Sequence, residues 1–167
     1  MAINVLFFYQ HFWPDSPPYA NMLRAISSEL ASRGKTVSVV TAAPAYKSVD
    51  RNTHVSRREM VDGVKVTRLS LLPGSRKSRL IRIVSKAIWP TRATFYVLFQ
   101  RILGQKQDVV VAATIPPVAN GFFGLIAAKL AGAKFVYHLQ DIYPEIAATG
   151  GLWSCLLYTS PSPRDRG

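Results

Sequence analysis

Residues 3–41 read INVLFFYQHFWPDSPPYANMLRAISSELASRGKTVSVVT, and this stretch decides the fold. It opens with an all-apolar run, Ile3–Tyr9, which is typical of a parallel strand buried on both faces. Apolar residues then recur at helical spacing from Leu23 to Leu30, before a second strand, Lys35–Thr41. Two strands joined by a helix form a right-handed, parallel β-α-β unit.

The rest of the chain continues this alternation of strands and helices. Two short β-runs flank Asp62-Gly63, which is a strong hairpin signal. The further elements that we predict are the helices Ser78–Trp89 and Thr91–Leu103, interrupted at Pro90, the strand Asp108–Ala113, the helix Asn120–Leu130 and the strand Phe135–Leu139. The sequence therefore predicts an α/β, Rossmann-like, doubly wound parallel sheet.

Composition and charge narrow the class of protein. The 167 residues are enough for one globular domain, and Cys155 is the only cysteine, so no disulfide is expected. The N-terminus has no basic region or cleavage site of a signal peptide, and no apolar run is long enough to span a bilayer. Residues 51–106 hold thirteen Lys and Arg but two acidic residues, so this segment carries +11 of the net charge of +12.

The C-terminal stretch Cys155–Gly167 (CLLYTSPSPRDRG) differs in character from the rest of the chain. Within it, Cys155–Asp165 resembles the translation of a transposase-type sequencing adapter, and we expect the whole stretch to be a non-native tail. An ordinary disordered tail is the alternative, because Ser-Pro-Ser-Pro cannot build a helix or a central strand. We therefore expect a single domain over residues 1–154, followed by a tail over 155–167.

The loop after the first strand is the first candidate site. It lacks the Gly-x-Gly-x-x-Gly fingerprint, which disfavours a nicotinamide or flavin dehydrogenase. Asp15, Tyr19 and Asn21, together with His11, offer donors and acceptors beside a helix N-terminus and are predicted to bind a ligand. The alternative is structural: Asp15 or Ser16 caps the helix and Tyr19 packs against the core.

The end of the last predicted strand is the second candidate site. His138 and Gln140 are two residues apart and point to one face, and Asp141 and Glu145 follow. A histidine, an amide and two carboxylates at one strand end suit the binding of sugar hydroxyls or acid–base catalysis. The alternative is a hydrogen-bonded core histidine followed by a helix cap.

The middle segment is both basic and amphipathic. Cationic residues are interleaved there with apolar and aromatic ones, as in helices that lie on anionic membranes. The residues predicted to contact a membrane are Arg76, Lys77, Arg79, Arg82, Lys86 and Trp89. A helix packed on the sheet with a solvated basic edge explains the same pattern.

Several of these motifs together resemble the N-terminal domain of glycosyltransferase family 4, which has the two-domain GT-B fold. The residues that carry the resemblance are Phe12–Asp15, Pro17–Ala20, Leu30–Gly34 before Val37–Thr41, Asp62–Val64 leading to Arg68, and Tyr137–Glu145. The span Ile3–Gly150 looks closest to bacterial enzymes that build O-antigen and colanic-acid-type polysaccharides, including the L-fucosamine transferase group. The resemblance makes the fold the N-terminal half of GT-B, an incomplete one that lacks the donor-binding domain.

The resemblance implies a retaining transfer of a hexose unit from a nucleotide diphosphate sugar to a lipid-linked acceptor. It implies Asp141 and His138 as catalytic residues, Asp15, Tyr19, Asn21, Gln140 and Glu145 as acceptor-side residues, and neither a metal nor a cofactor. The expected place is cytoplasmic, peripheral at the inner face of the cell membrane, with no nucleic acid as partner. The competing hypothesis is a non-catalytic, basic, Rossmann-like module that binds nucleic acid or an anionic membrane.

Overall fold

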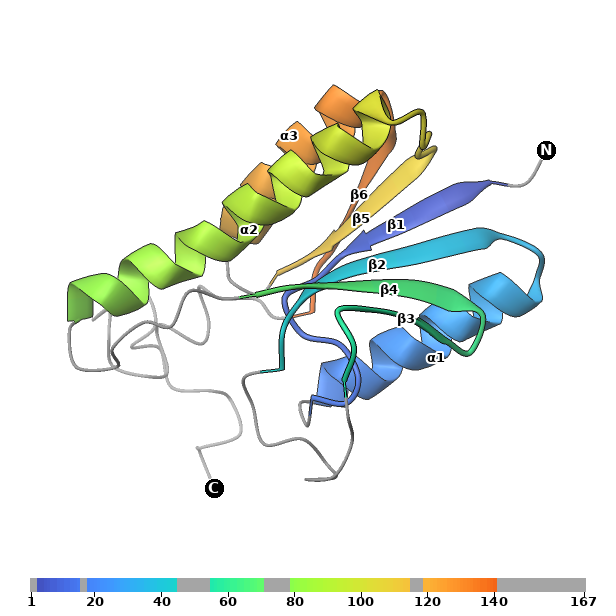
Figure 1. The fold of residues 1–167 in the computed structure, drawn as a ribbon, viewed down its shortest axis with the longest axis horizontal. Coiled ribbons are helices and arrows are strands. Elements are labelled where there is room, and N and C mark those ends of the chain that lie inside the picture. Colours follow the sequence, from blue (N-terminus) through green and yellow to red (C-terminus); the bar gives the residue numbers. More distant parts are fainter. Residues whose placement is uncertain (1–2, 16–17, 45–54, 71–78, 115–118, 141–167) are drawn as a thin grey trace, which may run out of the picture.

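A six-stranded sheet forms the centre of the molecule (Figure 1). This computed structural model describes residues 3–15, 18–44, 55–70, 79–114 and 119–140. The strands are β1 (Asn4–Phe8), β2 (Thr36–Ala42), β3 (Arg58–Val61), β4 (Val64–Leu69), β5 (Val109–Ala113) and β6 (Lys134–His138). Their order across the sheet is β3-β4-β2-β1-β5-β6. The predicted α/β, Rossmann-like architecture is confirmed.

All strand pairs are parallel except the hairpin of β3 and β4. The central strand β1 pairs with β2 on one side and with β5 on the other. The hairpin turns at Asp62 and Gly63, whose φ angles of 49° and 78° are both left-handed. Asp-Gly is the dipeptide that tolerates two such residues, so the sequence signal and the turn agree.

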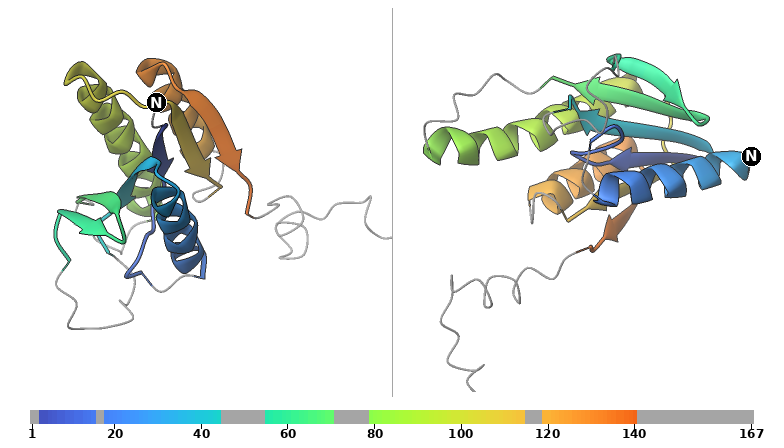
Figure 2. Two further views of the ribbon diagram at one scale, coloured as in Figure 1. Left: turned by 90° about the vertical axis from the view of Figure 1, so that its right-hand side faces the viewer. Right: turned by 90° about the horizontal axis from the view of Figure 1, so that it is seen from below.

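Three helices form the outer layers: α1 (Pro18–Ser32), α2 (Arg79–Ile102) and α3 (Ala119–Ala131). Helix α1 covers one face of the sheet, and α2 and α3 lie side by side on the other (Figures 1 and 2). This distribution follows from right-handed crossovers, because the chain moves outward in one direction from β1 to β2 and in the opposite direction from β4 through β5 to β6. The chain therefore reverses direction between β1 and β5.

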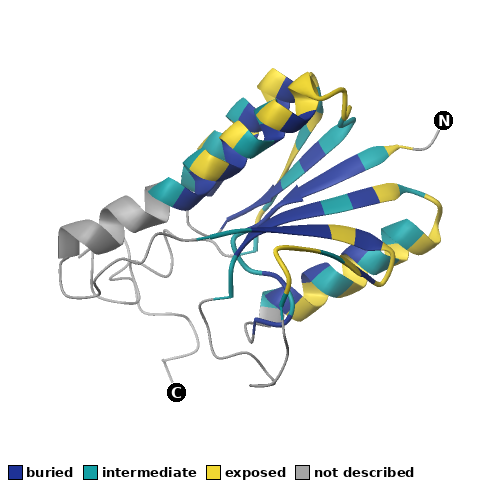
Figure 3. Cartoon of the chain, in the orientation of Figure 1, coloured by how far each residue is buried: buried dark blue, intermediate teal, exposed yellow. Residues whose placement is uncertain are grey.

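The core has two parts, one on each face of the sheet (Figure 3). Side chains of successive residues in β1 alternate between them: Phe7 faces α1, whereas Phe8 faces α2 and α3. The ring of Phe8 meets the indole of Trp89 edge-on, with 5.1 Å between their centroids. Strands buried on both faces read as continuous apolar runs, which explains the pattern Ile3–Tyr9.

Two predictions about the middle segment are wrong. Pro90 does not separate two helices, because α2 runs without a break from Arg79 to Ile102. Burial on both sides of the proline holds the helix together: Trp89, Ala93 and Val97 repeat every four residues and all face the core. Trp89 is 1% exposed, so it is a core residue and is withdrawn as a predicted membrane contact.

Helix α3 approaches the sheet closely at Gly124. A Cβ atom at this position would lie 2.6 Å from Cβ of Ala112 on β5 and 3.2 Å from the ring of Phe135 on β6. Real carbon atoms do not approach to 2.6 Å, so only glycine fits without displacing the helix. This close packing sets the position of the first turns of α3 over the carboxyl ends of β5 and β6.

Candidate functional site at the carboxyl edge of the sheet

Asn120, in the first turn of α3, joins the two strands between which the chain reverses direction. Its Nδ2 donates to the carbonyl oxygen of Phe8 at 3.3 Å and to that of Ala113 at 2.9 Å. These residues end β1 and β5, and the Asn120 side chain is fully buried between them. In doubly wound sheets, ligands bind outside the carboxyl ends of strands at this reversal.

Thr114, directly after β5, connects the end of β5 to the end of β6. Its hydroxyl donates to the carbonyl oxygen of His138 at 3.1 Å and accepts from the amide nitrogen of Gln140 at 3.0 Å. One side chain thus fixes the backbone on both sides of Leu139, immediately after β6 ends. The two predicted site residues on this stretch are therefore held in a defined backbone conformation.

Tyr9 and His138 contact each other across the carboxyl edge. The phenol oxygen of Tyr9 lies 2.5 Å from Nδ1 of His138, and the Tyr9 side chain is buried in the core on the α1 face. Burial raises the pKa of the Tyr9 phenol above its ordinary value, because the charged phenolate would lose its hydration. The phenol therefore keeps its proton, and it can donate to Nδ1 when the imidazole carries its proton on Nε2.

A second group of polar side chains follows β1 directly. Nδ1 of His11 lies 2.9 Å from Oδ2 of Asp15, and the rings of His11 and Tyr19 meet edge-on with 5.9 Å between centroids. Asp15 is buried, and among the described residues its Oδ1 has no hydrogen-bond partner. Buried carboxylate oxygens are normally hydrogen-bonded. Because Oδ1 lacks a partner among the described residues, it can accept a hydrogen bond from a ligand hydroxyl.

Arg68 on β4 holds the loop between β1 and α1 in place. It is 4% exposed, and its guanidinium donates to the carbonyl oxygens of Trp13 at 2.9 Å and Ser56 at 3.0 Å. It also forms an ion pair with Glu59 on the neighbouring strand at 2.5 Å. The planar guanidinium can serve three acceptors at once, which a lysine cannot do with the same geometry.

Arg24 of α1 holds the outer side of the loop. Its guanidinium lies 4.5 Å from the centroid of the Trp13 ring and donates to the Asp62 carboxylate at 2.7 Å. This hydrogen bond lowers the pKa of Asp62 below its ordinary value. The loop between β1 and α1 is thus tied to β4 and to the β3–β4 hairpin.

The structure describes some of the predicted site residues, and most of these lie at the carboxyl edge. Asp15, Tyr19 and His138 lie at the carboxyl edge with the contacts given above, and Gln140 joins them through its backbone. The side-chain nitrogen and oxygen of Gln140 are both buried and have no partner among the described residues. Asn21 is exposed on the first turn of α1.

The other predicted residues are not reached by the structural description. Asp141 and Glu145, the basic residues Arg76 and Lys77, and the tail 155–167 lie outside the described residues. Arg79, Arg82 and Lys86 lie within α2, but the structure describes only the helix there, not the side chains. The predictions on these residues stay predictions.

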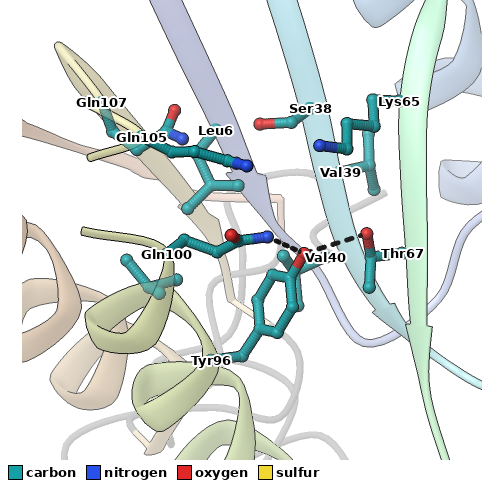
Figure 4. Close-up of a pocket in the computed structure, with 11 residues that line it drawn as sticks. Leu6, Ser38, Val39, Val40, Lys65, Thr67, Tyr96, Gln100, Gln105 and Gln107 are labelled. Carbon is teal, nitrogen blue, oxygen red and sulfur yellow. Dashed lines mark hydrogen bonds between the residues drawn. The ribbon is translucent and has the colours of Figure 1, made fainter. Parts of the chain in front are cut away.

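A cavity lies elsewhere, between α2 and the sheet (Figure 4). The hydroxyl of Tyr96 faces into it, hydrogen-bonded to Thr67 at 3.2 Å and to the amide of Gln100. The lining residues are Leu6, Ser38, Val39, Val40, Lys65, Thr67, Tyr96, Val97, Gln100, Gln105 and Gln107. None of them belongs to the carboxyl-edge group, so this cavity is separate from the candidate site.

The architecture fits the sequence family that the chain matches. The sequence model of the glycosyl transferase 4-like domain matches residues 19–164. The chain belongs to this family. Among curated proteins, no match to the chain was found. The reaction class of a glycosyl transferase 4-like domain is glycosyl transfer, and the carboxyl edge is where its sheet places the candidate ligand-binding groups.

From the sequence, no site role is predicted for three residues that shape the edge of this glycosyl transferase 4-like domain. Tyr9 ends an apolar run, Arg68 enters only through the family resemblance, and Asn120 begins a predicted helix. The signal available was the residue type itself. An arginine inside a β-run and an asparagine directly before an apolar helix both need buried partners.

Two negative observations concern the described part of the domain. No group of three His, Cys, Asp or Glu side chains comes close enough together there to hold a metal ion. None of the helices in the same residues combines the length and the apolar character needed to cross a membrane.

Proposed function

We propose that this domain forms the acceptor side of a retaining glycosyltransferase. The enzyme would move a hexose-type sugar from a nucleotide diphosphate sugar to a lipid-linked acceptor during the synthesis of a cell-surface polysaccharide. Family membership supports glycosyl transfer, and the resemblance to polysaccharide-building enzymes supports the acceptor class. The nucleotide sugar is a substrate in this proposal, and no metal ion or cofactor is assigned to the reaction.

The observation that carries the proposal is the set of unpartnered polar atoms at the carboxyl edge. Oδ1 of Asp15 and both side-chain polar atoms of Gln140 are buried without hydrogen-bond partners among the described residues. His138 adds an Nε2–H donor when its Nδ1 accepts from the phenol of Tyr9. A sugar hydroxyl both donates and accepts, so a set of acceptors, an amide and a donor suits it.

The residues that follow Gln140 complete the proposed site. We assign Asp141 and His138 to catalysis, and Glu145, with Tyr19 and Asn21, to acceptor binding, on the basis of the resemblance around residues 137–145. Donor binding is assigned to a second domain that this family fold requires, so we expect negligible turnover of nucleotide sugars by residues 1–154 alone. A place at the inner face of the cell membrane follows from a lipid-linked acceptor and from the basic middle segment.

The proposal can be tested by acceptor binding. The chain is titrated, in detergent micelles, with a polyprenyl-diphosphate-linked monosaccharide while ¹⁵N-labelled amide and imidazole resonances are followed. We expect saturable shifts at His138 and Gln140, and loss of binding in Gln140→Leu. Gln105→Leu is the matched control, because Gln105 is exposed and lies between the end of α2 and the start of β5, at the amino ends of the strands.

Two outcomes would contradict the proposal. Saturable binding of a nucleotide sugar by this chain, with no binding of the lipid-linked sugar, would assign it to the donor side. Tight binding of DNA or RNA with a steep dependence on salt would favour the basic binding module.

A further inference from the structure

The outer face of α2 exposes large apolar side chains in a regular row. Phe95, Phe99 and Ile102 are 66%, 57% and 72% exposed, and they follow one another at helical spacings of four and three residues. They point away from the core, which the same helix meets with Trp89, Ala93 and Val97. Helix α2 is therefore apolar on two opposite sides, and packing within the domain explains only one of them.

Helix α3, which lies beside α2, also exposes apolar side chains. Phe122 is 59% exposed and Leu125 is also exposed, both on the side of α3 turned away from the sheet. The two helices touch at this level, because the hydroxyl of Thr94 donates to the carbonyl oxygen of Phe123 at 3.2 Å. We call Phe95, Phe99, Ile102, Phe122 and Leu125 the outer helical face; Figure 3 shows exposed segments along both helices.

Among the described residues, the charged side chains on the two helices of the outer helical face are all positive. Arg92, Arg101 and Lys129 are exposed on the same two helices, and neither helix contains an Asp or Glu. From Gly63 to Gln140 the sequence holds one acidic residue, Asp108. That carboxylate accepts from the backbone nitrogen of Asn4 at 2.8 Å and lies near Lys106, so it does not offset the cations of the helices.

This combination selects the kind of partner. Three phenylalanines and two aliphatic side chains on neighbouring helices are more than the scattered exposed apolar residues of a soluble domain, and such a patch marks a binding surface. A protein partner would have to offer a strongly acidic surface to meet these cations. Phenylalanine and leucine within a ring of cations that lacks carboxylates are the features of a helix lying on anionic lipid.

We propose that the outer helical face docks on an anionic membrane, with Phe95, Phe99 and Phe122 buried at the boundary between headgroups and acyl chains. This inference rests on the proposed peripheral membrane location and names the surface responsible for it. It replaces Trp89, which is buried, with residues that the structure leaves exposed.

Docking by this face also orients the candidate site. Helix α3 begins at Ala119, directly after the loop that leaves β5, and Asn120 in its first turn contacts the carboxyl ends of β1 and β5. The first turn of α3 therefore lies at the carboxyl edge of the sheet. With α2 and α3 flat on the bilayer, the carboxyl edge opens along the membrane surface, where the polar head of a lipid-linked sugar lies.

The test is sedimentation of the 167-residue chain with vesicles. Phosphatidylcholine vesicles with and without phosphatidylglycerol are compared for the unaltered chain, the double variant F95S/F99S and the charge variant R101E/K129E. We expect binding only with phosphatidylglycerol, and a partition coefficient lower by at least about tenfold in F95S/F99S, because each phenyl ring loses its burial in lipid. The charge variant should lose binding in a similar way.

Met60→Ser is the matched control, because Met60 is 66% exposed on the edge strand β3 and does not belong to the outer helical face. It should bind as the unaltered chain does. The altered residues are exposed, and far-ultraviolet circular dichroism confirms that each variant is folded before its binding is interpreted.

Three outcomes would overturn the inference. Unchanged binding of F95S/F99S would leave membrane association in place but locate it elsewhere. Absence of binding by the unaltered chain would remove membrane docking, while the titration with a lipid-linked sugar in detergent would still test the proposed function. If light scattering shows a dimer without lipid, and F95S/F99S abolishes that dimer, then a second copy of the chain binds the outer helical face.

Discussion

The phenol oxygen of Tyr9 lies 2.5 Å from Nδ1 of His138, and this hydrogen bond connects the ends of β1 and β6 across β5. The two residues are 129 positions apart in the chain. Since burial keeps the phenol protonated, the phenol can donate to Nδ1, and we expect this bond to favour the tautomer with its proton on Nε2. His138 can then offer a donor, Nε2–H, to a molecule bound at the carboxyl edge.

Removal of the Tyr9 hydroxyl should change the tautomer of His138. In Tyr9→Phe we expect the neutral imidazole to become a mixture of Nδ1–H and Nε2–H forms, because nothing else described contacts Nδ1. The measurement is the pair of ¹⁵N imidazole shifts in long-range ¹H–¹⁵N spectra. Tyr137→Phe is the control, since that ring stacks on Phe135 on the α3 face. A single Nε2–H form in Tyr9→Phe would show that the hydroxyl does not set the tautomer.

Burial of Tyr9 should make the fold sensitive to alkaline pH. The folded pKa of Tyr9 is raised above its ordinary value of 10.0, so its contribution to stability is fully present below pH 10.0 and is lost as pH rises above it. The free energy of unfolding, measured with urea, should therefore fall above pH 10.0, and less steeply in Tyr9→Phe. Equal slopes for the two proteins would contradict the assignment.

Loss of the Arg68 guanidinium should destabilise the whole domain. Arg68→Met would leave Glu59 without its ion-pair partner and the carbonyl oxygens of Trp13 and Ser56 without donors. We expect the free energy of unfolding to fall by about 3 kcal/mol, the range for breaking one side of a buried pair. Arg58→Met, at an exposed position of β3, should change it by about 0.5 kcal/mol or less.

The Arg68 prediction has a second, independent readout. In the double variant Arg68→Met/Glu59→Leu, neither charge remains, and we expect part of the lost stability to return. A double variant as unstable as the sum of both single ones would show that the two side chains act independently.

The close approach of α3 to the sheet should discriminate between two glycines. Gly124→Ala would place Cβ 2.6 Å from Cβ of Ala112, and we expect a loss of roughly 1–3 kcal/mol in thermal or urea unfolding. Gly121→Ala would meet only the ring of Tyr137, a partly exposed side chain that can move aside. It should be neutral or stabilising, by up to about 1 kcal/mol from helix propensity. Equal effects at both positions would contradict the packing argument.

The sheet was predictable because its pattern is local. Runs buried on both faces, such as Ile3–Tyr9, and the Asp62-Gly63 turn carry their signal in neighbouring residues, and the strands found match those expected. Helix α2 shows where local signals end. It is apolar on two sides, so the sequence does not say which aromatic residues face the core. Trp89 was predicted on the exposed side, but it faces the core.

The candidate site was predictable only in part, for a related reason. Asp15, His138 and Gln140 stand where strands end, so the topology alone brings them to one edge. Their partners come from distant positions: Tyr9 contacts His138, and Arg68 reaches the loop of Asp15 from β4. Such long-range pairs leave no periodic trace in a sequence, because each depends on how separate elements pack.

The amide of Asn120 has one more consequence. Since it bridges Phe8 and Ala113, the carboxyl ends of the two central strands are joined by a single side chain that belongs to a helix and not to any loop. Exchanging the loops after β1 or β6 with those of another member of the family would therefore leave this connection intact while altering which molecule is recognised.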